Sequence, residues 1–129
     1  ANTILAEQTR NITSEDKAKN LLKMCGLAKD MKVALENNDI SSFGRILDEG
    51  WQLKKELASG IANPAIDEAM KNGALGGKLL GAGGGGFLLF YCEEEKQDQL
   101  KKAIGLRELD FSFERDGTSV IYIGDKYWN

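Results

Sequence analysis

The segment that most constrains this chain is residues 73–92, GALGGKLLGAGGGGFLLFYC, in which eight residues are glycine and Lys78 is the single charged residue. Glycine lacks a Cβ, so its backbone can adopt positive φ and approach a ligand or another segment closely. Successive amides of such a loop can converge on an anion, and a nearby lysine adds positive charge. The segment therefore predicts a phosphate-associated loop. The alternative is a glycine-rich turn packed against a neighbouring element.

Two familiar phosphate-binding patterns do not fit this segment. Gly81, Gly83 and Gly86 match G-x-G-x-x-G, but an apolar strand-like run follows them, whereas the dinucleotide-binding pattern opens a helix. A Walker A loop needs a glycine five residues before Gly77 and Ser or Thr after the lysine, where this chain has Asn72 and Leu79. The loop is therefore expected to belong to another class.

The chain on either side of the loop predicts a mixed fold. Apolar residues at helical spacing predict helices before residue 73, with Asp39 and Asn63 as N-caps and Pro64 at a first helical position. After it we expect strands at 77–82, 87–92, 109–115 and 118–123, with a helix over 93–104 between the second and the third. This order predicts an α+β sandwich with a mainly antiparallel four-stranded sheet and additional N-terminal helices.

Composition narrows the chemistry. A chain of 129 residues suits one domain, and the absence of histidine excludes Ser-His-Asp and Cys-His catalysis and His-ligated metals within it. Cys25 and Cys92 suit buried thiols in a reducing cytoplasm. A net charge of −3, with neither half basic, predicts no nucleic-acid or membrane partner, and the polar first 20 residues predict no signal peptide.

The whole glycine-rich string is more specific than its parts. Residues 74–86, ALGGKLLGAGGGG, resemble the third, C-terminal signature of the GHMP kinases, and residues 60–67, GIANPAID, resemble the stretch that precedes it in many sugar kinases. The resemblance covers essentially the whole chain, as residues 1–129 of a C-terminal domain. It implies a ferredoxin-like sheet with added helices, which agrees with the expected order of elements.

Within the family, residues 53–60 and 73–87 look most like the kinases of D-glycero-D-manno-heptose 7-phosphate. That likeness implies ATP-dependent phosphorylation of an anomeric hydroxyl, with Mg²⁺. Leu80 and Phe87 stand where Thr and Cys are common in the superfamily, which makes the mevalonate-kinase type a poorer match. Kinases of the fucose or galactose type remain an alternative, and so does a non-catalytic ligand-binding module of ferredoxin-like fold.

The family's second signature, P-x-x-x-G-L-G-S-S-A, is absent from these residues. The resemblance therefore implies that a missing N-terminal kinase domain supplies the ATP-binding loop, the Mg²⁺ ligands and the catalytic group. We expect the chain alone to be inactive, to carry no catalytic or metal-ligating residue, and to work with that domain on a small sugar phosphate. An apolar face left where that domain docks would make the chain self-associate.

The candidate site follows from the glycine-rich loop. In the complete enzyme the resemblance places this loop at the cleft between domains, against the phosphates. Lys78 is a supporting candidate, although a solvated strand lysine explains it equally well, and Lys54 and Lys55 suit an exposed helix face better than a sugar phosphate. The candidate residues are Gly81, Ala82, Gly83, Gly84, Gly85 and Gly86 of the loop, with Lys78, Ser59 and Asn63 in support.

Overall fold

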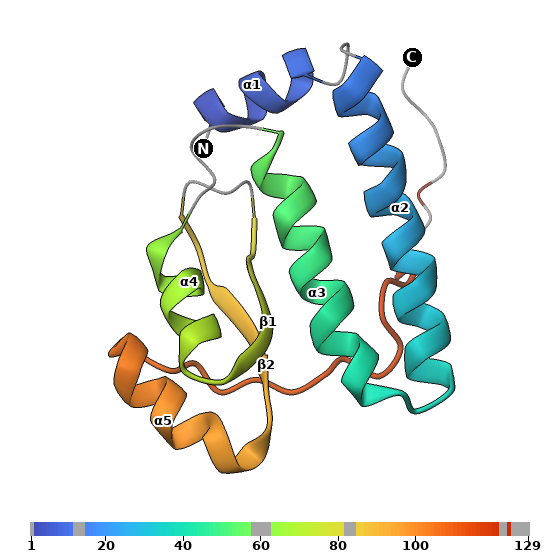
Figure 1. The fold of residues 1–129 in the computed structure, drawn as a ribbon. Coiled ribbons are helices and arrows are strands. Elements are labelled where there is room, and N and C mark those ends of the chain that lie inside the picture. Colours follow the sequence, from blue (N-terminus) through green and yellow to red (C-terminus); the bar gives the residue numbers. More distant parts are fainter. Residues whose placement is uncertain (1, 12–14, 58–62, 82–84, 122–123, 125–129) are drawn as a thin grey trace.

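The computed structural model describes residues 2–11, 15–57, 63–81, 85–121 and 124. Their order is three helices, a further short helix, a β-hairpin and a last helix (Figure 1). The elements are α1 Asn2–Asn11, α2 Glu15–Glu36, α3 Ile40–Lys55, α4 Pro64–Lys71, β1 Ala74–Leu79, β2 Leu88–Cys92 and α5 Glu94–Ile104.

Local capping fixes where two of the helices begin, as the sequence predicts. Asp39 caps α3, and its carboxylate accepts a hydrogen bond from the Ser42 amide at 3.2 Å. Asn63 caps α4, and its Oδ1 accepts from the Ala65 amide at 2.9 Å, with Pro64 at the first helical position. Each cap satisfies an amide that the first helical turn leaves without a partner.

The described strands, β1 and β2, form an antiparallel pair, in which Lys78 lies opposite Leu89 and Leu79 opposite Leu88. The predicted strand over 77–82 instead begins at Ala74 and ends at Leu79. The shift arises because the Ala74 end of the strand is buried against α4 and α5, whereas Leu80 and Gly81 are exposed beyond the end of the ladder.

The core lies where α3 and α4 meet the hairpin. Trp51 of α3, Ile66 of α4 and Leu79 of β1 form one buried cluster, and a second joins α4, β1 and α5 through Ala69, Ala74 and Leu100. Helix α3 lies between α2 and the hairpin (Figure 1), so α2 packs mainly on α3. The last turn of α3 therefore lies at the same end of the domain as the glycine-rich loop, which connects β1 to β2.

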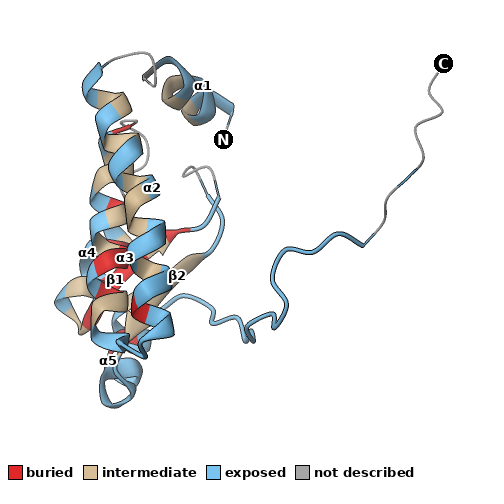
Figure 2. Cartoon of the chain, turned by 90° about the vertical axis from the view of Figure 1, so that its right-hand side faces the viewer, coloured by how far each residue is buried: buried red, intermediate tan, exposed pale blue. Residues whose placement is uncertain are grey.

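The expected four-stranded sheet is not formed by the described residues. Residues 105–121 continue from α5 as an exposed arm without helix or strand, which Figure 2 shows leaving the body of the domain. The predicted strand 109–115 and the described part of 118–123 have no ladder partner there, and residues 122–123 lie outside the described residues. A strand is stable only when it is paired and has one face covered. Here an ion pair between Lys101 and Glu108 at 3.0 Å holds the start of the arm against α5, and its apolar residues stay exposed.

Candidate functional site

The glycine-rich loop connects the two strands of the hairpin. The Leu80 amide donates to the Phe87 carbonyl at 2.8 Å, which extends the antiparallel pairing by one step and leaves residues 81–86 as the connection. Gly86 has φ +127°, and a Cβ built there would lie 2.5 Å from the Leu80 oxygen. Only glycine therefore fits this end of the loop. The predicted residues Ala82, Gly83 and Gly84 lie outside the described residues.

Lys54 reaches this loop from the last turn of α3. Its Nζ donates a hydrogen bond to the Gly81 carbonyl oxygen at 2.7 Å, across 27 positions of the chain. Loss of solvent at this position lowers the pKa of the Lys54 ammonium, and the nearby positive charge of Lys78 lowers it further. The contact makes Lys54 part of the candidate site, where the sequence favoured an exposed helix face.

Lys78 lies on β1 and lines the same cavity as Lys54. The cavity has a volume of about 230 Å³ and lies between α2, α3 and the end of β1. Apart from the two lysines, every described residue that lines it is apolar or glycine: Met24, Leu27, Ala28, Met31, Ile46, Leu47, Gly50 and Trp51. The cavity therefore combines an apolar wall with two cations and no described carboxylate.

The other supporting candidates do not join this group. Ser59 lies outside the described residues, and the Asn63 side-chain oxygen is engaged in capping α4. The sequence contains a signal for Lys54 that the prediction did not use. Lys54 follows the buried Trp51 by three residues on the same helix, which places both on one side of it.

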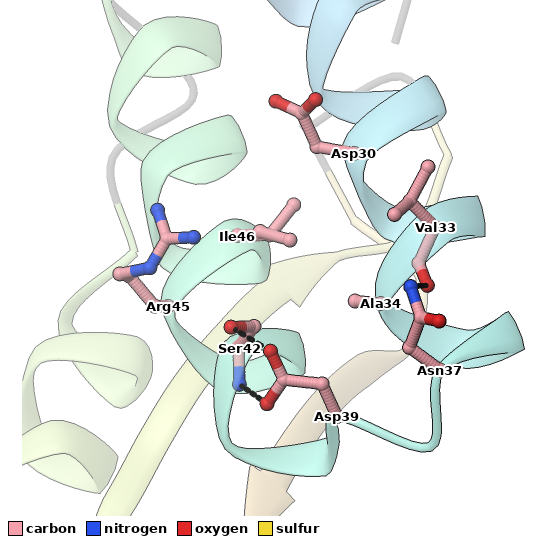
Figure 3. Close-up of a pocket in the computed structure, with 8 residues that line it drawn as sticks. All are labelled: Asp30, Val33, Ala34, Asn37, Asp39, Ser42, Arg45 and Ile46. Carbon is pink, nitrogen blue, oxygen red and sulfur yellow. Dashed lines mark hydrogen bonds between the residues drawn. The ribbon is translucent and has the colours of Figure 1, made fainter.

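A second cavity, of about 300 Å³, lies at the opposite end of α3, where α2 ends and α3 begins (Figure 3). Asp39 and Ser42 line it, and their hydrogen bonds are those of the helix cap. Arg45 also lines it and pairs with Glu49 of its own helix at 3.5 Å. These polar groups already have partners that stabilise the start of α3, so the glycine-rich end of the domain is the better candidate site.

Among the residues that the structure describes, no three Asp, Glu or Cys side chains come together in a group that could hold a metal ion. None of the helices described is long and apolar enough to span a membrane.

Comparison with known proteins gives a family and several relatives. The family described as "GHMP kinases C terminal" matches residues 31–108, which run from the second half of α2 to the start of the arm. The chain is 35% identical over 94 residues to the D-glycero-alpha-D-manno-heptose 7-phosphate kinase of Campylobacter jejuni, covering 67% of this chain and 28% of that protein.

Two other relatives are kinases of different substrates. The chain is 36% identical over 77 residues to the L-fucokinase/L-fucose-1-P guanylyltransferase of Bacteroides fragilis, covering 57% of this chain and 8% of that protein. It is 33% identical over 70 residues to the mevalonate kinase of Methanocaldococcus jannaschii, covering 52% of this chain and 22% of that one. The chain thus spans less than a third of each of these relatives.

Proposed function

The chain belongs to the family of GHMP kinase C-terminal domains, and from this we propose that it is part of an ATP-dependent sugar kinase. Its substrate is a sugar or sugar phosphate that accepts the phosphoryl group on its anomeric hydroxyl. D-glycero-D-manno-heptose 7-phosphate is the first choice, because a kinase of the alpha anomer of that sugar matches 67% of the chain. A fucose kinase is the second choice, since two fucokinase-containing proteins also match at 34–36% identity.

One observation carries the proposal: a glycine-rich hairpin loop and two lysines with no described carboxylate partner lie at the same end of the domain. Phosphoryl transfer depends mainly on positioning and on stabilising negative charge. Gly85 and Gly86 are exposed and have no side chains, so an anion can approach their backbone amides closely. The loop would complete the cleft that a preceding kinase domain forms.

ATP and Mg²⁺ are the cofactors that this proposal implies. The two lysine cations and the loop amides complement the negative charge of a triphosphate. ATP supplies the phosphoryl group when it is bound. The described residues bring no carboxylates together for Mg²⁺, so no step is assigned to the metal on this chain. We also propose that the ATP-binding loop lies in a preceding domain, that the 129 residues alone are inactive, and that the protein works in the cytoplasm.

The first test uses the complete protein that contains this chain. It is assayed with ATP against heptose 7-phosphate, fucose and galactose, and heptose 7-phosphate is expected to give the highest kcat/KM. Turnover of fucose with none of heptose 7-phosphate would move the assignment to the fucose type. No turnover of any sugar would favour a non-catalytic binding module.

A loop variant tests whether the glycine-rich hairpin takes part in the reaction. A Cβ on Gly85 would meet no atom within 4 Å, so Gly85→Val is expected to fold normally. It should nevertheless lower kcat/KM, because the side chain would stand between the loop amides and the transferred group. The melting temperature provides the control for folding. Wild-type turnover by a folded Gly85→Val protein would assign the loop a structural role only.

A further inference from the structure

We propose that Lys54 and Lys78, which both line the cavity between α2, α3 and β1, together form a receptor for a phosphate group. The inference rests on the proposed function, which supplies phosphorylated ligands, and it adds the residues that would recognise a phosphate on this chain. Two ligands carry that chemistry in the proposed reaction: the sugar, through a phosphate remote from its reacting hydroxyl, and the nucleotide.

Lys54 keeps N–H donors available for a ligand. A lysine ammonium carries three N–H donors. Lys54 uses one of them on the Gly81 carbonyl oxygen, which holds its Nζ in place and leaves two donors for a ligand. Neither Lys54 nor Lys78 forms an ion pair with a described residue, whereas Lys19, Lys32, Arg45 and Lys101 each pair with a carboxylate.

Different elements of the fold bring the two positive charges to one cavity. Lys54 comes from the end of a helix and Lys78 from a strand, yet they line one cavity whose other described lining residues are apolar or glycine. Like charges repel at such a position, and the lowered pKa of Lys54 reflects both the loss of water and the charge of Lys78. A dianion bound between them would relieve the repulsion, and the apolar wall would strengthen the attraction because it keeps water away.

A structural explanation accounts for only part of this arrangement. Lysines in the last turn of a helix interact favourably with the helix dipole, which suits both Lys54 and Lys55 of α3. The dipole does not explain why Lys78, on a strand, lines the same cavity. Lys55 therefore offers a matched control: it has the same charge, lies in the same helical turn, and does not line the cavity.

The binding test uses inorganic phosphate and the 129-residue chain. Phosphate is titrated while the NMR signals of the lysine side chains are followed, and saturable shifts are expected at Lys54 and Lys78. Charged hydrogen bonds of this kind predict about tenfold weaker binding in Lys54→Ala and in Lys78→Ala. Lys55→Ala should change the affinity less than twofold. Equal effects of all three substitutions, or shifts that do not saturate, would overturn the proposal.

Kinetics of the complete protein identify the source of the phosphate. If the sugar carries it, Lys78→Ala raises the KM for the phosphosugar about tenfold and leaves the KM for ATP unchanged. If the nucleotide carries it, the KM for ATP rises instead. Unchanged KM values for both substrates would reject the receptor while the kinase function stands. Phosphate binding that depends on both lysines, in a protein that phosphorylates no sugar, would reject the kinase function and leave the receptor standing.

Discussion

The main-chain oxygen of Gly44 occupies the space that a side chain on Gly76 would need. A Cβ built on Gly76 would lie 2.0 Å from that oxygen, and one built on Gly44 would lie 2.7 Å from the Cβ of Leu75. Helix α3 therefore lies directly on the backbone of β1. This contact sets the distance of the helix from the hairpin, and with it the reach of Lys54 to Gly81.

Gly76→Ala is expected to destabilise the protein, because neither backbone can move without separating α3 from β1. Overpacking of this kind costs about 1–3 kcal/mol or more in the free energy of unfolding. Gly26→Ala is the control: Gly26 lies within α2, and a Cβ there meets nothing within 4 Å. Alanine should stabilise that helix by about 0.5–1 kcal/mol. Urea denaturation measures both variants, and a Gly76→Ala protein as stable as wild type would contradict the packing described.

This contact also shows how far the sequence could predict the site. Caps are local, since Asp39 and Asn63 act on amides two or three residues away, and both were predicted correctly. The role of Gly76 depends on its contact with Gly44, more than thirty residues earlier in the chain. The sequence alone therefore could not distinguish Gly76 from the glycines of the loop. The glycine excess therefore has two physical causes, which are close packing under α3 and backbone conformation in the hairpin loop.

Long-range contacts account for the remaining differences. The hydrogen bond from Lys54 to Gly81 joins a helix end to a loop, and only the packing of α3 on β1 brings them together. Alternating polar and apolar residues over 109–115 predict a strand, but the structure forms none there. Pairing depends on what lies beside the segment, which the local pattern does not contain.

Removal of the Asp39 cap should weaken the start of α3. Hydrogen bonds from the side chains of Ser42 and Ser41 and from the Ser42 amide hold the pKa of Asp39 below its ordinary value of 3.8. A carboxyl whose pKa is lower in the folded state stabilises the fold above its unfolded pKa, and this contribution is lost as the pH falls through the folded value. Asp39→Ala is therefore expected to lower the melting temperature at pH 7.

Asp39→Asn separates the cap from its charge. Asparagine is also a good N-cap but does not titrate. The melting temperature of the wild type should exceed that of Asp39→Asn at pH 7, and the difference should shrink as the pH falls below 3.8. A difference that stays constant from pH 7 to pH 2 would show that the charge of Asp39 does not contribute.

The two cysteines should differ in reactivity. Cys25 is exposed, contrary to the buried thiol expected from the sequence, whereas Cys92 is half-buried and its Sγ donates to the Gly73 oxygen at 3.4 Å. Burial raises the pKa of the Cys92 thiol; Lys96 opposes this shift, and Glu93 and Glu95 add to it. Less of the Cys92 thiol is therefore present as thiolate at neutral pH.

Iodoacetamide should alkylate Cys25 first and Cys92 only at higher pH, as measured by mass spectrometry of peptides. The difference should vanish in urea, and equal rates in the folded protein would contradict the burial of Cys92.

The exposed arm should make the chain self-associate. Leu109, Phe111 and Phe113 alternate with polar residues, and the two phenylalanine rings contact each other edge-on at 5.7 Å between centroids while remaining exposed. An apolar stripe of this kind promotes association because burying it removes apolar surface from water. Sedimentation velocity over a range of concentrations is therefore expected to show oligomers.

The double substitution Phe111→Ser, Phe113→Ser should lower the association constant at least about tenfold, since each ring buries large apolar area on contact. The control, Asp110→Asn with Ser112→Ala, changes the polar residues of the same segment. It should leave the association constant unchanged, because the apolar stripe remains. A chain that sediments as a monomer at every concentration would show that the arm does not bind a second copy.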